Sequence, residues 1–156
     1  MLFNRQITEW EHIVNGSCDI EFDYVAIDRI GQLAIFSTFN RGFKPKIVTK
    51  SFEDFLKLDE FMETLPKIAK PIQKTESDGI YDDWKKYAEL GFYAYDNQDV
   101  HRTNKLERYD IIYQPKKPLK IESQTELKKF ENIIPKFDLV FGENLKFEEL
   151  EKALRE

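Results

Sequence analysis

Two strongly apolar runs lie close together near the start of the chain, and they constrain its fold more than any other feature. Residues 22–28 read FDYVAID and residues 33–39 read LAIFSTF, with only RIGQ between them. Both runs are rich in β-branched and aromatic residues, and a short link that contains Gly31 favours a β-hairpin. Both faces of these runs are apolar, which is typical of central strands covered by helices.

The other segments predict a mixture of helices and strands. Apolar spacing predicts helices near residues 3–14, 51–65, 80–90 and 123–134, strands at 92–95, 108–114 and 137–141, and a terminal helix carrying Phe147, Leu150 and Leu154. Ser51 and Ser123 are the expected N-caps, and Gly91 should follow the 80–90 helix. Pro71 and the polar run 74–78 predict a linker.

Hairpins mixed with helices indicate an α+β fold with a mainly antiparallel sheet, a central hairpin and several covering helices. The order of the strands does not follow from the pattern. A chain of 156 residues suits a single domain, which we assign to residues 1–156. It is also long enough to bury a core without a disulfide or a structural metal.

The beginning of the chain and its one cysteine indicate where the protein works. Residues 1–12, MLFNRQITEWEH, carry Glu9 and Glu11 where a secretory signal would be apolar. No apolar run approaches the roughly 18 residues of a membrane span. Cys18 cannot form an internal disulfide, which fits a reducing compartment. We therefore expect a cytoplasmic protein that does not bind a membrane.

The charge of the chain is negative and unevenly spread. The formal net charge is −5, which argues against a direct nucleic-acid binder and fits a basic protein partner. Between residues 76 and 99, seven acids stand against Lys85 and Lys86, whereas residues 100–120 carry six bases against Glu107 and Asp110. The acidic stretch is therefore the candidate recognition surface.

Aromatic residues within this stretch strengthen that interpretation, since Trp and Tyr are enriched at interface hot spots and opposite charge speeds encounter. The alternative is that the aromatic residues belong to the core, and Trp84 in particular has core spacing. The candidate partner-binding residues are Asp82, Asp83, Tyr93, Tyr95, Asp96 and Asp99.

Candidate catalytic and metal-binding groups are few. Asp96, Asp99 and His101 are suitable ligands for a divalent metal, but their spacing matches no metal motif, and a solvated loop is the favoured interpretation. Cys18 has no recognisable histidine motif near it, and no phosphate-binding, dinucleotide-binding or serine-hydrolase motif occurs. We expect a non-enzymatic protein without a cofactor or a metal.

Three segments resemble small immunity proteins of bacterial polymorphic-toxin systems, of the contact-dependent inhibition type. They are residues 23–38, DYVAIDRIGQLAIFST, then residues 91–96, GFYAYD, and, after a polar loop with a histidine, residues 108–115, RYDIIYQP. The resemblance implies a cytoplasmic protein that binds and blocks the toxin domain of its neighbour. The acidic charge of the chain favours a basic toxin domain, such as a nuclease.

The resemblance supplies no catalytic residues. Two other hypotheses remain: a non-enzymatic scaffold or regulatory module, and a small metal-assisted hydrolase that uses Asp96, Asp99 and His101. A co-purified metal would favour the hydrolase.

Overall fold

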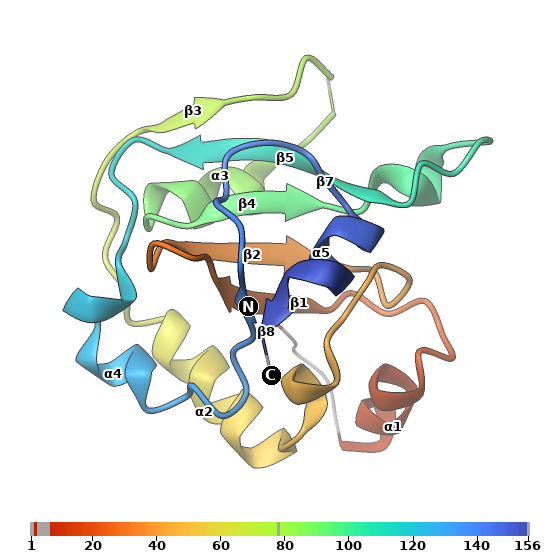
Figure 1. Cartoon of the computed structure of the whole chain (residues 1–156), viewed down its shortest axis with the longest axis horizontal. Helices are drawn as coiled ribbons and strands as arrows, with labels where there is room; N and C mark the ends of the chain where they lie inside the picture. Colours follow the sequence, from red (N-terminus) through yellow and green to blue (C-terminus); the bar gives the residue numbers. More distant parts are fainter. Residues whose placement is uncertain (1, 3–6, 78, 156) are drawn as a thin grey trace.

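The computed structural model describes residues 2, 7–77 and 79–155, and in this part of the chain the strands form one mixed sheet (Figure 1). The strands are β1 (Asp23–Ile27), β2 (Leu33–Ser37), β3 (Pro71–Gln73), β4 (Tyr93–Asp96), β5 (Arg108–Pro115), β6 (Lys136–Phe137), β7 (Leu145–Lys146) and β8 (Leu154–Arg155). Their order is β3-β5-β4-β2-β1-β6-β8, and β7 pairs with the first residues of β5.

Most neighbouring strands in this sheet are antiparallel, but β2 is parallel to β4 and β1 is parallel to β6. The expected α+β class with a mainly antiparallel sheet is therefore confirmed. The two parallel pairs join segments that are far apart in the sequence, and local patterning did not predict them.

The hairpin predicted from the first two apolar runs is present at the centre of the sheet. β1 and β2 pair so that Val25 lies opposite Ile35. Gly31 has a φ of +86°, a conformation that glycine adopts without a steric penalty. The buried Asp28 carboxylate accepts hydrogen bonds from the backbone N–H groups of Ile30 and Gln32, at 3.1 and 2.7 Å. These contacts hold the turn in one conformation.

Helices lie on both sides of the sheet. They are α1 (Ile7–Asn15), α2 (Phe52–Met62), α3 (Asp82–Glu89), α4 (Thr125–Lys128) and α5 (Phe147–Ala153), together with the 3₁₀ turns η1 (Lys46–Thr49), η2 (Gln98–His101) and η3 (Ile121–Ser123). In Figure 1, α3 lies behind β4 and β5, whereas α5 lies in front of the sheet. None of the helices in the described residues is long and apolar enough to cross a membrane.

Two of the predicted helix boundaries are confirmed. The Ser51 hydroxyl caps α2 by accepting a hydrogen bond from the Asp54 backbone N–H at 3.1 Å. After α3, Gly91 has a φ of +105°, its N–H donates to the Ala88 carbonyl, and the Phe92 N–H donates to the Tyr87 carbonyl. This double hydrogen-bond pattern is a Schellman motif, and it fixes how α3 leads into β4.

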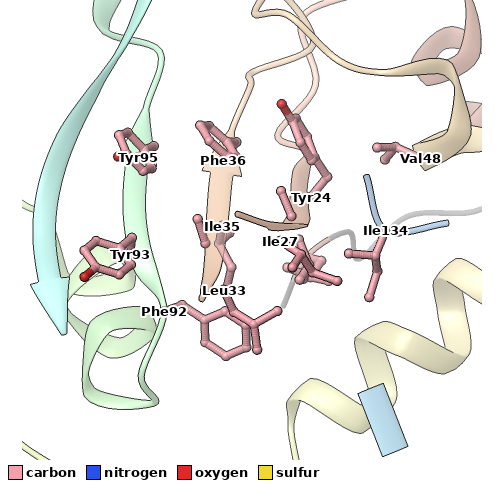
Figure 2. Close-up of a cluster of buried hydrophobic side chains, with 14 of the residues drawn as sticks. Tyr24, Ile27, Leu33, Ile35, Phe36, Val48, Phe92, Tyr93, Tyr95 and Ile134 are labelled. Carbon is pink, nitrogen blue, oxygen red and sulfur yellow. The ribbon is translucent and has the colours of Figure 1, made fainter. Parts of the chain in front are cut away.

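One face of the sheet carries a row of stacked aromatic rings. Tyr24, Phe36 and Tyr95 are cross-strand neighbours on β1, β2 and β4. Figure 2 shows the Phe36 ring between the other two, with ring centroids 5.2 Å from Tyr24 and 4.7 Å from Tyr95. Such offset stacks stabilise a core by about 0.5–1.5 kcal/mol per pair beyond area burial. Phe137 and Phe141 close this face with edge-on contacts to Phe36.

The C-terminal part of the chain departs from the sequence prediction. The helix expected over 123–134 is limited to α4, because the following hydrogen bonds tighten to a spacing of three residues and Pro135 disfavours a helical Ile134. Ser123 is not its cap, since the hydroxyl donates to the Lys120 carbonyl instead. The strand expected over 137–141 is reduced to β6, and Leu154 lies in β8 rather than in the terminal helix.

The expected linker also contains structure. β3 pairs antiparallel with the end of β5, with Pro71 opposite Pro115, and forms an edge of the sheet. A proline is tolerated at such an edge because its missing N–H need not join a ladder. The helix expected near residues 3–14 is confirmed as α1 from Ile7 onward, and its expected start at residues 3–6 lies outside the described residues.

The central position of β2 predicts a large effect of truncation there. Ile35 is fully buried, so we expect Ile35→Ala to lower the free energy of unfolding by about 2–5 kcal/mol. Ile72 on the edge strand β3 is 46% exposed, so Ile72→Ala is a matched control that should change it by less than about 0.5 kcal/mol. Urea denaturation measures both, and equal effects would contradict the central placement of β2.

Candidate functional site

A pocket of about 610 Å³ opens on the face of the sheet opposite the aromatic row. Its floor is formed by Asp23, Ser37 and Asp96. Helix α3 supplies one wall, the segments around residues 19–21 and 39–41 supply another, and η2 contributes to the rim. With Leu2, which also lines it, the pocket gathers residues from five separate parts of the chain.

The register of three strands places the floor residues in one row. Asp23 on β1 pairs with Ser37 on β2, and Ser37 pairs with Asp96 on β4. Because cross-strand partners project from the same face of a sheet, all three side chains face the pocket. The preceding row on this face, Val25, Ile35 and Ala94, is fully buried. The polar row thus begins where the apolar core ends.

Asp23 is held in place by a tyrosine hydroxyl, since Tyr87 of α3 donates a hydrogen bond to Asp23 Oδ2. Burial raises the pKa of Asp23 to about 7, although the nearby hydroxyls of Tyr87 and Ser37 favour the ionised form. Burial also raises the pKa of the Tyr87 phenol well above its usual value, so Tyr87 stays a hydrogen-bond donor at neutral pH.

Asp96 at the other end of the row behaves in the same way. Burial raises its pKa to about 6, although the nearby Gln98 and His101 side chains favour the ionised form. Its neighbour in the next strand, Asp110, differs because Arg102 and Arg108 both form ion pairs with it. Burial thus raises the pKa of Asp23 and Asp96 toward neutral pH, where small changes in their surroundings alter their charge.

Charge in the pocket is strongly unbalanced. The carboxylates that line it belong to Asp19, Glu21, Asp23, Asp83 and Asp96. Arg41 also lines the pocket, but its guanidinium donates to both carboxylate oxygens of Asp19. Within the described residues, no Lys or Arg forms an ion pair with Asp23 or Asp96. A cationic ligand would therefore supply the charge that the floor of the pocket lacks.

Aromatic side chains line the walls above the carboxylates. Trp84 of α3 and Phe39 at the end of the hairpin both contribute to the pocket, and both are half-buried. The Trp84 ring is held by an edge contact with Tyr81, with ring centroids 5.5 Å apart. An adjoining recess of about 360 Å³ shares Trp84, Asp96 and His101 with the pocket. These walls offer flat apolar surface beside the negative floor.

The residues predicted as a contact surface separate into two groups. Asp83 and Asp96 line the pocket, and Asp82 is exposed on α3 beside it. Tyr93 and Tyr95 are buried, and their hydroxyls donate to Gln32 Oε1 and to the Glu143 carbonyl, at 3.0 and 2.8 Å.

Asp99 is also buried, and its carboxylate accepts hydrogen bonds from the backbone N–H groups of Leu106 and Glu107. The structure therefore does not bring Tyr93, Tyr95 and Asp99 onto one exposed surface with the other candidates. The two tyrosines belong to the core, which was the alternative interpretation.

The proposed metal-ligand set is also divided by the fold. Asp96 and His101 line the pocket, whereas Asp99 points into the loop that it stabilises. Burial opposes ionisation of Asp99, but the two backbone donors and Arg102 outweigh it and lower its pKa below the usual value. In the described part of the chain, no group of three or more His, Cys, Asp or Glu side chains is placed to hold a metal ion.

The sequence analysis did not identify several of the pocket residues as candidates. Asp23 is the first residue of a strongly apolar strand, and Asp19 and Glu21 lie in a polar link, so no local pattern marked them. The structure also brings Cys18 Sγ within 3.5 Å of His12 Nδ1, although no sequence motif joins the two. His12 Nδ1 is shared with the Ser17 hydroxyl at 3.0 Å.

The chain matches no protein-family model, no curated protein and no solved structure with which it was compared. The geometry and charge of the pocket therefore carry the functional interpretation.

The raised pKa of Asp23 predicts a particular pH dependence of stability. Between the model-peptide pKa of 3.8 and about 7, folded Asp23 holds a proton that the unfolded chain has released, so stability falls as pH rises through this range. Between pH 5 and pH 8, the free energy of unfolding should fall by at least about 1 kcal/mol more in the wild type than in Asp23→Asn.

Asp82→Asn is the matched control, because Asp82 is exposed and lies outside the pocket. Urea denaturation at several pH values measures the effect. Parallel pH profiles for wild type and Asp23→Asn would show that burial does not perturb Asp23.

Proposed function

We propose that this chain is an immunity protein that binds a cognate toxin domain with a basic surface and neutralises it by occlusion. The observation that carries the proposal is the acidic pocket, whose floor carboxylates have no internal cationic partner among the described residues. The resemblance of the hairpin and of residues 91–96 and 108–115 to polymorphic-toxin immunity proteins supports it.

The physical demands on an immunity protein agree with such a pocket. The toxin must be captured before it acts, and an acidic inhibitor surface accelerates encounter with a basic partner. A nuclease toxin needs cationic residues to contact phosphates, and a complementary acidic surface would cover those residues. Trp84 and Phe39 beside the carboxylates supply the aromatic contact area that interface hot spots favour.

Two neighbouring acids on α3 allow a sharp test. Asp83 lines the pocket, whereas Asp82 is exposed beside it and does not. We co-express the chain with the product of its neighbouring gene and expect a stable complex and protection from toxicity. Asp83→Lys should then slow association severalfold at low salt, whereas Asp82→Lys, which makes the same change in net charge, should have a smaller effect.

Stopped-flow association at two salt concentrations, with circular dichroism to confirm folding, measures the difference. Equal effects of the two reversals would remove the pocket from the interface. A neighbouring gene product that is neither toxic nor bound would reject the immunity function and favour a scaffold or regulatory role.

A further inference from the structure

We infer that the floor of the acidic pocket is a receptor for one guanidinium group, presented by an arginine side chain of a partner protein. The inference deepens the proposed function, on which it rests for the identity of the partner. The chemistry of recognition rests on the pocket alone. The juxtaposition that carries it is the row Asp23, Ser37 and Asp96 beneath the aromatic walls of Trp84 and Phe39.

The dimensions of the row suit a broad, flat cation. Neighbouring strands are about 4.8 Å apart, so the backbones of Asp23 and Asp96 are separated by roughly 10 Å with Ser37 between them. A planar group that lies over Ser37 would be within reach of carboxylates at both ends of the row. A guanidinium offers five N–H donors in a planar fork, whereas an ammonium is a compact group with three donors.

The floor carboxylates retain the capacity to accept these donors. A carboxylate has about four acceptor positions, and the Tyr87 hydroxyl occupies one of those of Asp23. Beside Asp96, the Asn97 N–H donates to the Ser37 carbonyl. The Tyr87 bond positions the Asp23 carboxylate before a ligand arrives, which limits the ordering that binding requires.

The walls and the charge balance favour guanidinium further. A guanidinium is weakly hydrated and stacks on aromatic rings, and Trp84 and Phe39 line the pocket together with the acids. Among the described residues that line the pocket, Arg41 supplies a guanidinium, and it donates to both carboxylate oxygens of Asp19 on the wall. In the described part of the chain, Asp23 and Asp96 form no ion pair with a Lys or Arg. The Arg41–Asp19 pair shows the bidentate geometry that an incoming arginine would adopt with a carboxylate.

Proton linkage follows from the groups that surround the row. Asp23 is influenced by Tyr87 and Asp83 of α3 and by Asp96 of β4. Asp96 is influenced by His101 of η2 and Asp110 of β5. The other charged residues that line the pocket are Asp19, Glu21 and Arg41. A bound cation stabilises the ionised carboxylates. Affinity should therefore rise as pH increases through about 6 to 7, where Asp96 and Asp23 ionise, and then level off.

The test uses the full chain and small probes, so it does not require the toxin. N-acetyl-arginine amide, N-acetyl-lysine amide and the neutral N-acetyl-citrulline amide are titrated at pH 7.5 and low salt, with binding followed by NMR of the backbone amides. We expect shifts at Ser37 and Asp96 with the arginine probe, severalfold weaker binding of the lysine probe and no binding of the citrulline probe.

Variants assign the effect to the floor of the pocket. Asp23→Asn and Asp96→Asn should each weaken binding of the arginine probe about tenfold, the loss expected for one charge-assisted hydrogen bond. Asp82→Asn, which lies outside the pocket, should leave binding unchanged. Thermal unfolding confirms that each variant is folded. If a variant does not fold, the pH dependence of arginine-probe binding to the wild type replaces that test, and the affinity should rise through about pH 6 to 7.

Each outcome decides the inference. Equal binding of the arginine and lysine probes, binding of the citrulline probe, or wild-type affinity in both variants would overturn the guanidinium receptor. Binding of the arginine probe without binding of the neighbouring gene product would reject the immunity function and leave the receptor standing. A complex with that gene product, together with no binding of any probe, would support the immunity function and overturn the guanidinium receptor.

Discussion

The pairing of β2 with a strand on each side is the constraint on which the rest of the structure depends. β2 runs antiparallel to β1 and parallel to β4. A residue of β2 therefore has one partner on β1 and one on β4, and the three residues form a row across the sheet. One alignment stacks Tyr24, Phe36 and Tyr95 in the core (Figure 2). The next alignment along the strands, Asp23, Ser37 and Asp96, lies on the opposite face and forms the floor of the pocket.

These two rows have opposite energetic effects. The aromatic row buries large apolar surfaces, which stabilise the fold by roughly 25 cal/mol for each Å² removed from water. The acidic row places carboxylates where burial disfavours their charge, as the raised pKa values of Asp23 and Asp96 show. The neighbouring aromatic core offsets this cost. Under the proposal made above, a bound cation would relieve it.

Helix α3 connects the core to the pocket. Tyr87 and Ala88 are buried against the sheet, while Asp83 and Trp84, one turn earlier, line the pocket wall. The Schellman motif at Gly91 fixes the angle between this helix and β4, which carries Asp96. These backbone hydrogen bonds hold the end of the α3 wall beside the strand that carries Asp96.

The sequence by itself determined the features that depend on neighbouring residues: the β1–β2 hairpin with its Gly31 turn, the Ser51 cap of α2 and the Gly91 end of α3. Only the tertiary structure decided which acids share a site. The β2–β4 pairing joins segments separated by more than fifty residues, and no local pattern encodes its register. Asp23 has the local signature of a strand start, and Tyr93 and Tyr95 have that of an aromatic surface. Their opposite roles arise because a sheet assigns each side chain to a face through partners that are distant in the sequence.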